Sequence, residues 1–582
     1  MFLVIGLVMT MIAAPGPDVV GDPSARLRDL FEDEWQQRLA DDPMMASRLG
    51  DARFGDRWPN LSPEAIAKRE AREKDVLTRL ATIPTSDLSA SARLDADIFR
   101  RRYELAVAEQ RFKGHLLPLN HMEGIQSLTQ EIISFPFRDL RDYENWLARI
   151  KTFPLFMDQT IALMKEGIKT RILHPRVIME RVPEQIAAQI VEDPAKSPFF
   201  EPFTRFPDTI DAAHRGRLAD EARSLIAQNV VPAYRSLAAF FEAEYLPACP
   251  AEIGASHRPL GAEWYAALAR RYTTTDLTPA QIHEIGQKEV ARIRAAMETT
   301  KHAAGFDGSF AEFLTFLRTD SRFHYSDPDE LLLQYRALSR RIDPGLVKLF
   351  KTLPRTPYGV EPIPDDIAPD TTTAYYRQPA ADGSRAGTYF VNLYKPEVRP
   401  IYEMEALSLH EAVPGHHFQI ALAMERSDLP SFRRYDDITA FVEGWGLYAE
   451  SLGEDLGFYK DPYSKFGQLT YEMWRAVRLV VDTGMHSMGW TRQQAIDFFV
   501  SNAAKTEHDI VNEIDRYIAW PGQALAYKIG ELKIKELRAR AEAALGPRFD
   551  VREFHDVVLL EGAVPLDVLA SRVDAWIAAQ SR

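Results

Sequence analysis

Residues 410–417 read His-Glu-Ala-Val-Pro-Gly-His-His, the most informative run in a chain of 582 residues. Apolar side chains at helical spacing precede it, from Met404 onward, and predict a mostly buried helix that leads into the run. Pro414 cannot donate a backbone hydrogen bond to the carbonyl group of residue 410, and its ring clashes with that carbonyl. We therefore expect the helix to bulge or break inside this run.

The same run is typical of a zinc site in which one short segment supplies two imidazoles and a general base. In the common form of the motif, the second His follows the first by four residues, so both rings leave the same helix face. Here Pro414 occupies that position. If the Pro-Gly segment absorbs two extra residues, His416 joins His410 as a ligand, and if it absorbs three, His417 does. The smaller distortion favours His416.

A second predicted helix, residues 438–450, offers a carboxylate as the third ligand. Glu443 lies among large apolar residues, where a carboxylate is costly to bury unless it meets a cation or hydrogen-bond donors. A tetrahedral catalytic zinc needs three protein ligands and an open position for water. We expect Glu443 to be the third ligand of one Zn²⁺ ion per chain. Glu450, two turns further on, is the alternative ligand or the partner of one of the histidines.

Glu411 directly follows the first expected ligand, so its carboxylate can reach a water on the metal and act as a general base. The reaction also needs donors for an oxyanion, and residues downstream of the second helix supply candidates. We expect Tyr527 and His486 to act in catalysis, and Arg516 and Tyr517 to bind the substrate. The alternative for each Tyr is a place in the core with its hydroxyl satisfied.

Two stretches depart from the helical pattern. Residues 353–387 are rich in Pro, Asp, Gly and Thr, which predicts a long surface excursion. Residues 387–394 are aromatic and β-branched, which predicts a strand. Such a strand could pair with an extended peptide, placing Tyr389 at the substrate. Equally, it could pair with another strand of a small sheet.

The remainder predicts a mainly α fold. Thr278 with Gln281 marks one helix start by the capping-box pattern, and Thr491 with Gln494 marks another. The Lys- and Glu-rich stretch 531–545 stops at a Gly-Pro pair. The β element is therefore expected to be small and to lie beside the metal-binding helix.

Composition excludes several classes of partner and site. The net charge of −14 is spread along the chain and argues against nucleic acid or an anionic membrane surface. The single cysteine, Cys249, rules out an internal disulfide and a thiolate zinc cluster, so a metal must use His, Asp or Glu. No segment after the first residues is apolar for long enough to cross a membrane.

The N-terminal residues suggest export. Phe2 to Ala14 form an apolar run, too short to span a bilayer and about the length of a signal-peptide core. No Lys or Arg precedes this run, and no Cys follows it closely to carry a lipid. We expect residues 1–24 to be a signal peptide or a disordered N-terminus, and the protein to be periplasmic or secreted. The alternative location is the cytoplasm.

Four strings resemble a large bacterial group catalogued as domain of unknown function 885. They are HEAVPGHHFQ (410–419), FVEGWGLYAE (441–450), RLVVDTGMHSMGW (478–490) and RYIAWPGQALAYKIG (516–530). The resemblance covers the chain from about residue 25 onward. It implies a relation to the gluzincin metallopeptidases, which include thimet oligopeptidase, angiotensin-converting enzyme and the thermostable carboxypeptidases.

The resemblance also implies a fold and a ligand set. Those enzymes are helical clamshells around a deep zinc cleft, so residues 25–582 are expected to form one such domain, with two lobes flanking the cleft. In these relatives a Gly precedes the second zinc His, as Gly415 precedes His416 here. In the oligopeptidases a Phe-Val-Glu string carries the third ligand, as residues 441–443 would.

We therefore expect a zinc-dependent hydrolase that cleaves peptide bonds of short peptides. One alternative is an amidase that acts on a non-peptide or modified amide. Another is a non-catalytic zinc-binding or peptide-binding protein that retains the helical shell.

Overall fold

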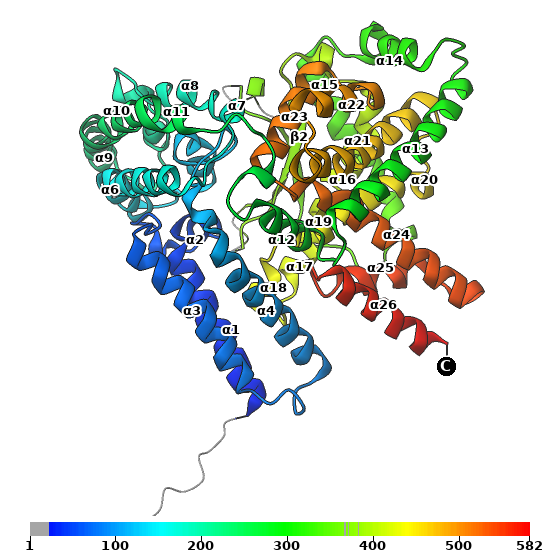
Figure 1. The fold of residues 1–582 in the computed structure, drawn as a ribbon, viewed down its shortest axis with the longest axis horizontal. Coiled ribbons are helices and arrows are strands. Elements are labelled where there is room, and N and C mark those ends of the chain that lie inside the picture. Colours follow the sequence, from blue (N-terminus) through cyan, green and yellow to red (C-terminus); the bar gives the residue numbers. More distant parts are fainter. Residues whose placement is uncertain (1–21, 366–367, 371, 382, 384, 582) are drawn as a thin grey trace, which may run out of the picture.

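The computed structural model describes residues 22–365, 368–370, 372–381, 383 and 385–581. Nearly all of the predicted N-terminal export segment, residues 1–24, lies outside them. The described chain is mainly helical with one small sheet, as the sequence predicts (Figure 1). None of the described helices combines the length and the apolar character needed to cross a bilayer.

The described N-terminal part, residues 22–248, contains helices joined by turns and loops, and no strand. Its first helices form one long group, and the next form a second group around α6, which Figure 1 shows in teal on the left. The elements up to residue 248 are α1 (Pro23–Asp41), α2 (Pro43–Arg48), α3 (Pro63–Ala81), α4 (Ala90–Glu109), α5 (Thr129–Ser134), α6 (Leu140–Thr170), α7 (Arg176–Met179), α8 (Val182–Ala187), α9 (Ala212–Leu225), α10 (Val231–Phe240) and α11 (Leu246–Ala248).

The second half contains longer helices and the sheet. The helices before the sheet are α12 (Gly261–Thr273), α13 (Pro279–Ala303), α14 (Phe310–Thr319) and α15 (Pro328–Ile342). Those after it are α16 (Met404–Glu411), α17 (His416–Glu425), α18 (Ser431–Arg434), α19 (Thr439–Ser451), α20 (Gly453–Leu456), α21 (Pro462–Ser487), α22 (Arg492–Asn502), α23 (Glu507–Ala519), α24 (Ala526–Leu545), α25 (Val551–Leu559) and α26 (Leu566–Gln580).

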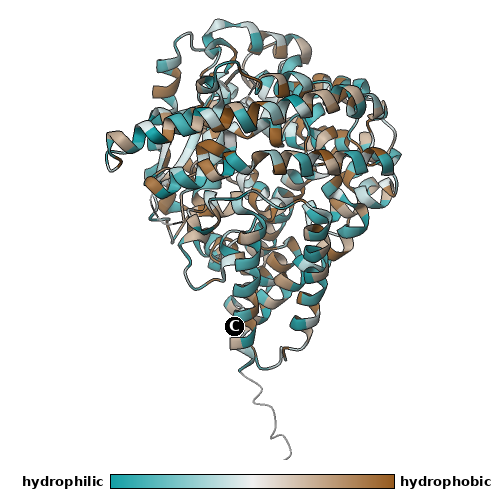
Figure 2. Ribbon diagram, turned by 90° about the vertical axis from the view of Figure 1, so that its left-hand side faces the viewer, coloured by the Kyte–Doolittle hydropathy of each residue, from teal (hydrophilic) through white to brown (hydrophobic). Residues whose placement is uncertain are grey.

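The predicted helix boundaries are confirmed. Thr278 and Gln281 form a complete capping box at the start of α13, and Thr491 and Gln494 form one at the start of α22. The Lys- and Glu-rich helix, α24, ends before Gly546, which adopts a φ of 52°. Figure 2 shows hydrophobic and hydrophilic residues alternating along the long helices, as expected for helices that bury one face.

The sheet has three strands in the order β1-β3-β2. The strand β3 (Gly387–Val391) pairs with β1 (Tyr358–Pro362) in parallel and with β2 (Ala374–Arg377) in antiparallel orientation. The prediction that residues 353–387 form a surface excursion is therefore wrong where β1 and β2 lie. Both edges of β3 are occupied, so it cannot pair with a peptide, and the alternative of a small sheet is confirmed.

Two large apolar cores hold these elements together, and each joins segments far apart in sequence. The first packs α6, α9 and α10 against α13, α21 and α23. The second packs α1, α3 and α4 against α15, the sheet, α16, α17, α19 and the last three helices. The helices α16, α17 and α19 thus lie inside the second core, and rigid packing on several sides fixes their side chains.

Candidate metal centre

The run at residues 410–417 breaks its helix, as Pro414 predicts. The helix α16 ends at Glu411 and α17 begins at His416. Trp445 of α19 donates a hydrogen bond from its indole nitrogen to the carbonyl oxygen of Pro414 at 2.7 Å. At Gly415, a Cβ atom would lie 1.8 Å from the carbonyl oxygen of His410. The close approach of the two helix ends therefore requires glycine at this position.

The break brings three predicted ligands together. One ligand atom from each of His410, His416 and Glu443 lies within 4.8 Å of the other two. The Oε2 atom of Glu443 is 3.6 Å from Nε2 of His410 and 3.4 Å from Nε2 of His416. This oxygen accepts no hydrogen bond within the described part of the chain. The arrangement leaves three potential ligand atoms around one small space.

Glu450 contacts His410 on the ring nitrogen that faces away from Glu443, and it is not one of the three potential ligands. Its carboxylate is fully buried and lies 2.8 Å from Nδ1 of His410. Since Nδ1 faces this carboxylate, the ring presents Nε2 to Glu443. A carboxylate behind a His ring fixes the orientation and tautomer of a metal-binding imidazole. Of the two roles expected for Glu450, the structure favours that of partner to a histidine.

The charges of this group are mutually dependent. Burial alone would lower the pKa of His410, but the carboxylates of Glu443 and Glu450 outweigh burial and raise this pKa to about 9. Burial alone would raise the pKa of Glu443, but His416 and His410 hold it well below its usual range. The carboxylate of Glu443 is therefore charged at neutral pH and attracts cations, whether protons or a metal ion.

His417 points away from the three ligands. Its Nδ1 lies 2.9 Å from the hydroxyl oxygen of Tyr376 in β2, and its Nε2 donates to the carbonyl oxygen of Thr356 at 3.1 Å. Burial lowers the pKa of His417 to about 4. Both ring nitrogens are engaged, so His417 connects α17 to the sheet, and His416 is the histidine that lies beside His410 and Glu443.

Glu411 is the last residue of α16, and its side chain is partly exposed. It follows His410 directly at the C-terminal end of α16. The role of Glu411 as a general base stays a prediction. No contact within the described chain assigns it another role.

Three other predicted site residues have structural partners. Tyr389 is fully buried in β3, with its hydroxyl 3.4 Å from that of Ser408. Tyr517 accepts a hydrogen bond from Arg478 at 2.8 Å and donates one to Glu513 at 2.6 Å. Fully paired, buried tyrosines cannot reach a substrate without losing these bonds.

His486 is the third of them. Its Nδ1 accepts a hydrogen bond from the backbone of Ala255 at 3.0 Å, and its Nε2 donates to the carbonyl oxygen of Tyr517 at 2.9 Å. The side chain is fully buried, and burial lowers its pKa to about 4. No ring nitrogen is left for an oxyanion, so we assign His486 a structural role.

Tyr527 and Arg516 also have partners within the protein: Tyr527 is 6% exposed, and Arg516 lies 3.6 Å from the carboxylate of Glu513. The hydroxyl of Tyr527 differs from that of Tyr517 in that it donates no hydrogen bond within the described chain. Arg516 donates to the hydroxyl oxygen of Tyr527 at 3.2 Å. Tyr527 lies one helical turn before Gly530 on α24. Gly530 touches the backbone of Gly444, the residue after Glu443, since a Cβ atom at Gly444 would lie 2.6 Å from Gly530. Tyr527 packs with Ala440 and Leu447 of α19, near the crossing of α19 and α24.

The sequence interpretation missed the glycines that permit this packing. A Cβ atom at Gly446 would lie 2.8 Å from the ring of His410. Gly446 on α19 therefore leaves space for the imidazole of His410, which belongs to α16. The signal was available: glycine is unfavourable in a helix interior, yet Gly444 and Gly446 both occur inside a predicted helix.

The fold and the site define a mainly helical protein in which His410, His416 and Glu443 form a cluster, with the buried Glu450 beside His410. A family described as "Bacterial protein of unknown function (DUF885)" matches residues 43–573, and the chain belongs to this family. That part of the sequence resemblance is confirmed. No curated protein matches the sequence.

Two solved structures are similar to the whole chain. The crystal structure of a "putative lipoprotein" from Colwellia psychrerythraea has a TM-score of 0.92 and 29% sequence identity, covering 96% of this chain and 100% of that chain. A "putative lipoprotein of unknown function" from Shewanella oneidensis has a TM-score of 0.70 and 16% identity, covering 94% of this chain and 99% of that chain. The second similarity shows the fold alone.

Proposed function

We propose that this protein is a zinc-dependent hydrolase that cleaves peptide bonds of short peptides. The observation that carries the proposal is the convergence of His410, His416 and Glu443 across a broken helix. The resemblance of the two ligand-bearing strings to gluzincin metallopeptidases supports it.

The donor set fits zinc in kind and in spacing. Ligand atoms about 2.0–2.1 Å from a tetrahedral zinc lie about 3.3 Å apart. The separations of Glu443 Oε2 from the two imidazole nitrogens, 3.6 and 3.4 Å, are close to this value. Imidazole and carboxylate donors suit zinc, and Glu450 supplies the outer carboxylate that zinc-binding histidines usually have. Three protein ligands leave a fourth position for water or substrate.

Glu411 and Tyr527 supply the remaining chemistry. A bound zinc ion lowers the pKa of water and polarises a carbonyl group. The carboxylate of Glu411 would accept the proton of the attacking water and deliver it to the nitrogen of the leaving amine. The hydroxyl of Tyr527, near the crossing of α19 and α24, would donate to the developing oxyanion, and Arg516 would hold that hydroxyl in place.

The first test separates a metalloenzyme from a non-catalytic shell. Purified full-length protein should bind one zinc ion per chain, and His410→Ala should bind less than a tenth of that amount under the same conditions. Ser408→Ala, two residues before the first ligand on α16, serves as the control and should keep its zinc. Substoichiometric zinc that does not change in His410→Ala would exclude the metal site.

The second test separates a peptidase from an amidase of other substrates. A library of short peptides is digested with the native protein and with Glu411→Gln, and the products are identified by mass spectrometry. We expect cleavage by the native protein and a loss of at least a hundredfold in Glu411→Gln, because the base is removed while the ligands stay. Full activity in Glu411→Gln would refute the proposed base, and zinc binding without any peptide cleavage would favour the amidase.

We also propose that the protein is exported. The similar structure from Colwellia psychrerythraea is described as a "putative lipoprotein", and residues 2–14 have the length and apolar character of a signal-peptide core. Fractionation of cells that express the full chain should place it outside the cytoplasm, and replacing Leu7 and Val8 with Asp should retain it inside.

A further inference from the structure

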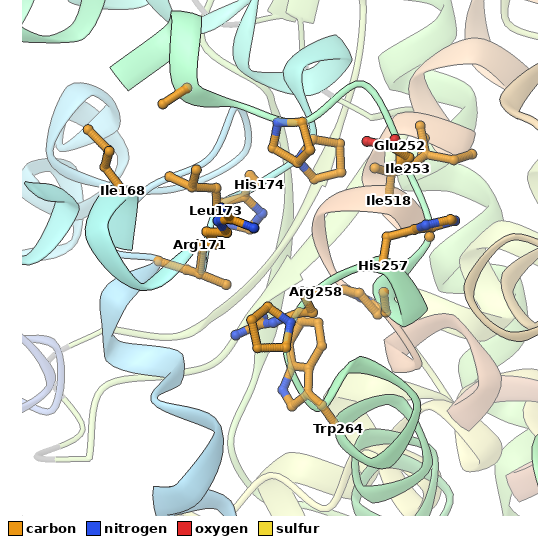
Figure 3. Close-up of a pocket in the computed structure, with 18 residues that line it drawn as sticks. Ile168, Arg171, Leu173, His174, Glu252, Ile253, His257, Arg258, Trp264 and Ile518 are labelled. Atoms are coloured by element: carbon orange, nitrogen blue, oxygen red, sulfur yellow. The ribbon is translucent and has the colours of Figure 1, made fainter. Parts of the chain in front are cut away.

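A cavity of about 610 Å³ lies apart from the candidate metal centre, and none of its lining residues belongs to that centre. Its lining comes from Leu117, the end of α6 with the turn that follows, the chain between α11 and α12, the start of α12, and the end of α23 with Pro521. Figure 3 labels ten of these residues, from Ile168 to Ile518. A volume of this size is within the range of small-molecule sites, about 300–1,000 Å³.

Arg258 lines this cavity and has no anionic partner among the described residues. One of its terminal nitrogens donates to the carbonyl oxygen of Phe112 at 3.2 Å, while Nε and Nη1 are buried without any hydrogen-bond acceptor. Its guanidinium group lies 3.8 Å from the centre of the Trp264 ring. Burial lowers the pKa of Arg258 to about 10. A guanidinium in this state is still charged at neutral pH and gains free energy from an anion.

His174 also lines this cavity, near enough to Arg258 for the charge of Arg258 to act on its ring. The residue is 6% exposed, and its Nε2 has no hydrogen-bond partner in the described chain. Burial first, and the charge of Arg258 second, lower the pKa of His174 to about 3. At neutral pH the ring is therefore uncharged, and it offers a polar group without adding a second positive charge. Buried polar groups of native proteins usually have partners, so both side chains point to a ligand.

The rest of the lining decides what kind of anion fits. Leu173, Ile253 and Ile518 give the walls apolar character, which suits an organic body. Arg171 and Glu252 are exposed lining residues of opposite charge and cancel each other. A single buried guanidinium beside an uncharged imidazole balances one negative charge, so a monoanion is favoured over inorganic phosphate.

Two sets of hydrogen bonds hold the walls in place without a ligand. His486 joins Ala255 to Tyr517, so it connects the chain before α12 to the end of α23. Asp482 accepts hydrogen bonds from the hydroxyl of Tyr265 at 2.5 Å and from the backbone of Gly522 at 3.1 Å. The cavity is therefore preformed, which reduces the entropy lost on binding.

We propose that this cavity binds a small organic monocarboxylate, whose carboxylate pairs with Arg258 and His174 and whose apolar body lies between Leu173, Ile253 and Ile518. The site is independent of the proposed hydrolase function, because it uses none of the metal-binding residues.

Titration calorimetry of the full-length protein with hexanoate, hexanamide and inorganic phosphate tests this proposal. Hexanoate should bind at least tenfold more tightly than hexanamide, which has the same body without the charge, and phosphate should bind more weakly than hexanoate. Arg258→Gln should abolish the preference for the acid over the amide. Arg171→Gln, at an exposed lining position, is the matched control and should retain it. Equal binding of acid and amide, or an unchanged preference in Arg258→Gln, would overturn the proposal.

Two further variants keep the test decisive. If Arg258→Gln does not fold, Ile253→Trp, which fills the cavity from a partly exposed position, should weaken hexanoate at least tenfold. His410→Ala distinguishes this site from the metal centre, because a carboxylate can also bind zinc. Hexanoate binding that survives in His410→Ala supports the cavity, whatever becomes of the hydrolase activity. Binding that is lost in His410→Ala places the carboxylate at the metal centre and refutes the inference.

Discussion

Replacing Glu450 with Gln removes one negative charge from behind His410 and leaves the size of the side chain almost unchanged. The carboxylate is fully buried, and its oxygen lies 2.8 Å from Nδ1 of His410. Loss of such an outer-shell carboxylate typically weakens metal binding about 10- to 100-fold. Because a tenfold change equals about 1.4 kcal/mol, we expect the zinc affinity of Glu450→Gln to fall by about 1.4–2.7 kcal/mol.

The assay is competition for zinc against a chromogenic chelator, using full-length protein. Glu454→Gln is the matched control, because Glu454 is exposed and pairs with Lys465 at the surface; its affinity should equal that of the native protein. Stability must be measured separately, since Arg475 lies 3.8 Å from Glu450 and loses a buried partner. If a folded Glu450→Gln protein binds zinc as tightly as the native chain, the assignment of Glu450 as the partner of His410 is wrong.

Three other predictions concern the helix break, the buried histidines and the oxyanion donor. Gly415→Ala should lower the free energy of unfolding by about 3 kcal/mol in urea titrations, because its Cβ would lie 1.8 Å from a backbone oxygen. The control is Gly216→Ala, in open space on α9, which should raise the free energy of unfolding by about 0.5–1 kcal/mol. Equal effects of the two substitutions would contradict the geometry. Burial lowers the pKa of His486 to about 4 and that of His555 to about 3, so below pH 6.5 the unfolded state binds protons that the folded state does not. The contribution of these two histidines to the free energy of unfolding should be complete above pH 6.5 and be lost as the pH falls toward 4. Between pH 7 and pH 5 the loss should be about 2 kcal/mol per histidine. A free energy of unfolding, measured in urea, that stays constant over this range would contradict the prediction. Tyr527→Phe should lower kcat about 10- to 100-fold with little change in KM, whereas Tyr517→Phe should lower thermal stability and leave kcat nearly unchanged; the reverse pattern would exchange their roles.

Local patterns predicted the helix starts, the helix break and the three candidate ligands, whereas tertiary partners decided the other roles. Thr278 and Thr491 mark helix starts because capping depends on residues three positions apart. Pro414 predicts the break from the same local chemistry. By contrast, the roles of His486 and Tyr517 depend on Ala255 and Arg478, which no sequence spacing connects to them.

The sheet shows the same limit. Its outer strands, β1 and β2, are four or five residues long and lie in a stretch rich in Pro, Asp and Gly. Such short strands exist because β3 pairs with both of them and because the second core covers one face. Local propensity in residues 353–387 could not reveal these long-range contacts.

The helix break and the third ligand depend on one another. In an unbroken helix, residues six apart differ by about 9 Å along the axis and about 240° in direction, so His410 and His416 could not face one carboxylate. The break removes both differences. Trp445 stabilises the broken segment by donating a hydrogen bond to the carbonyl oxygen of Pro414. Trp445 is also two residues from Glu443 on α19. One helix therefore fixes the path of the broken segment and supplies the carboxylate that both histidines face, so the geometry of the cluster is set by packing before any ion binds.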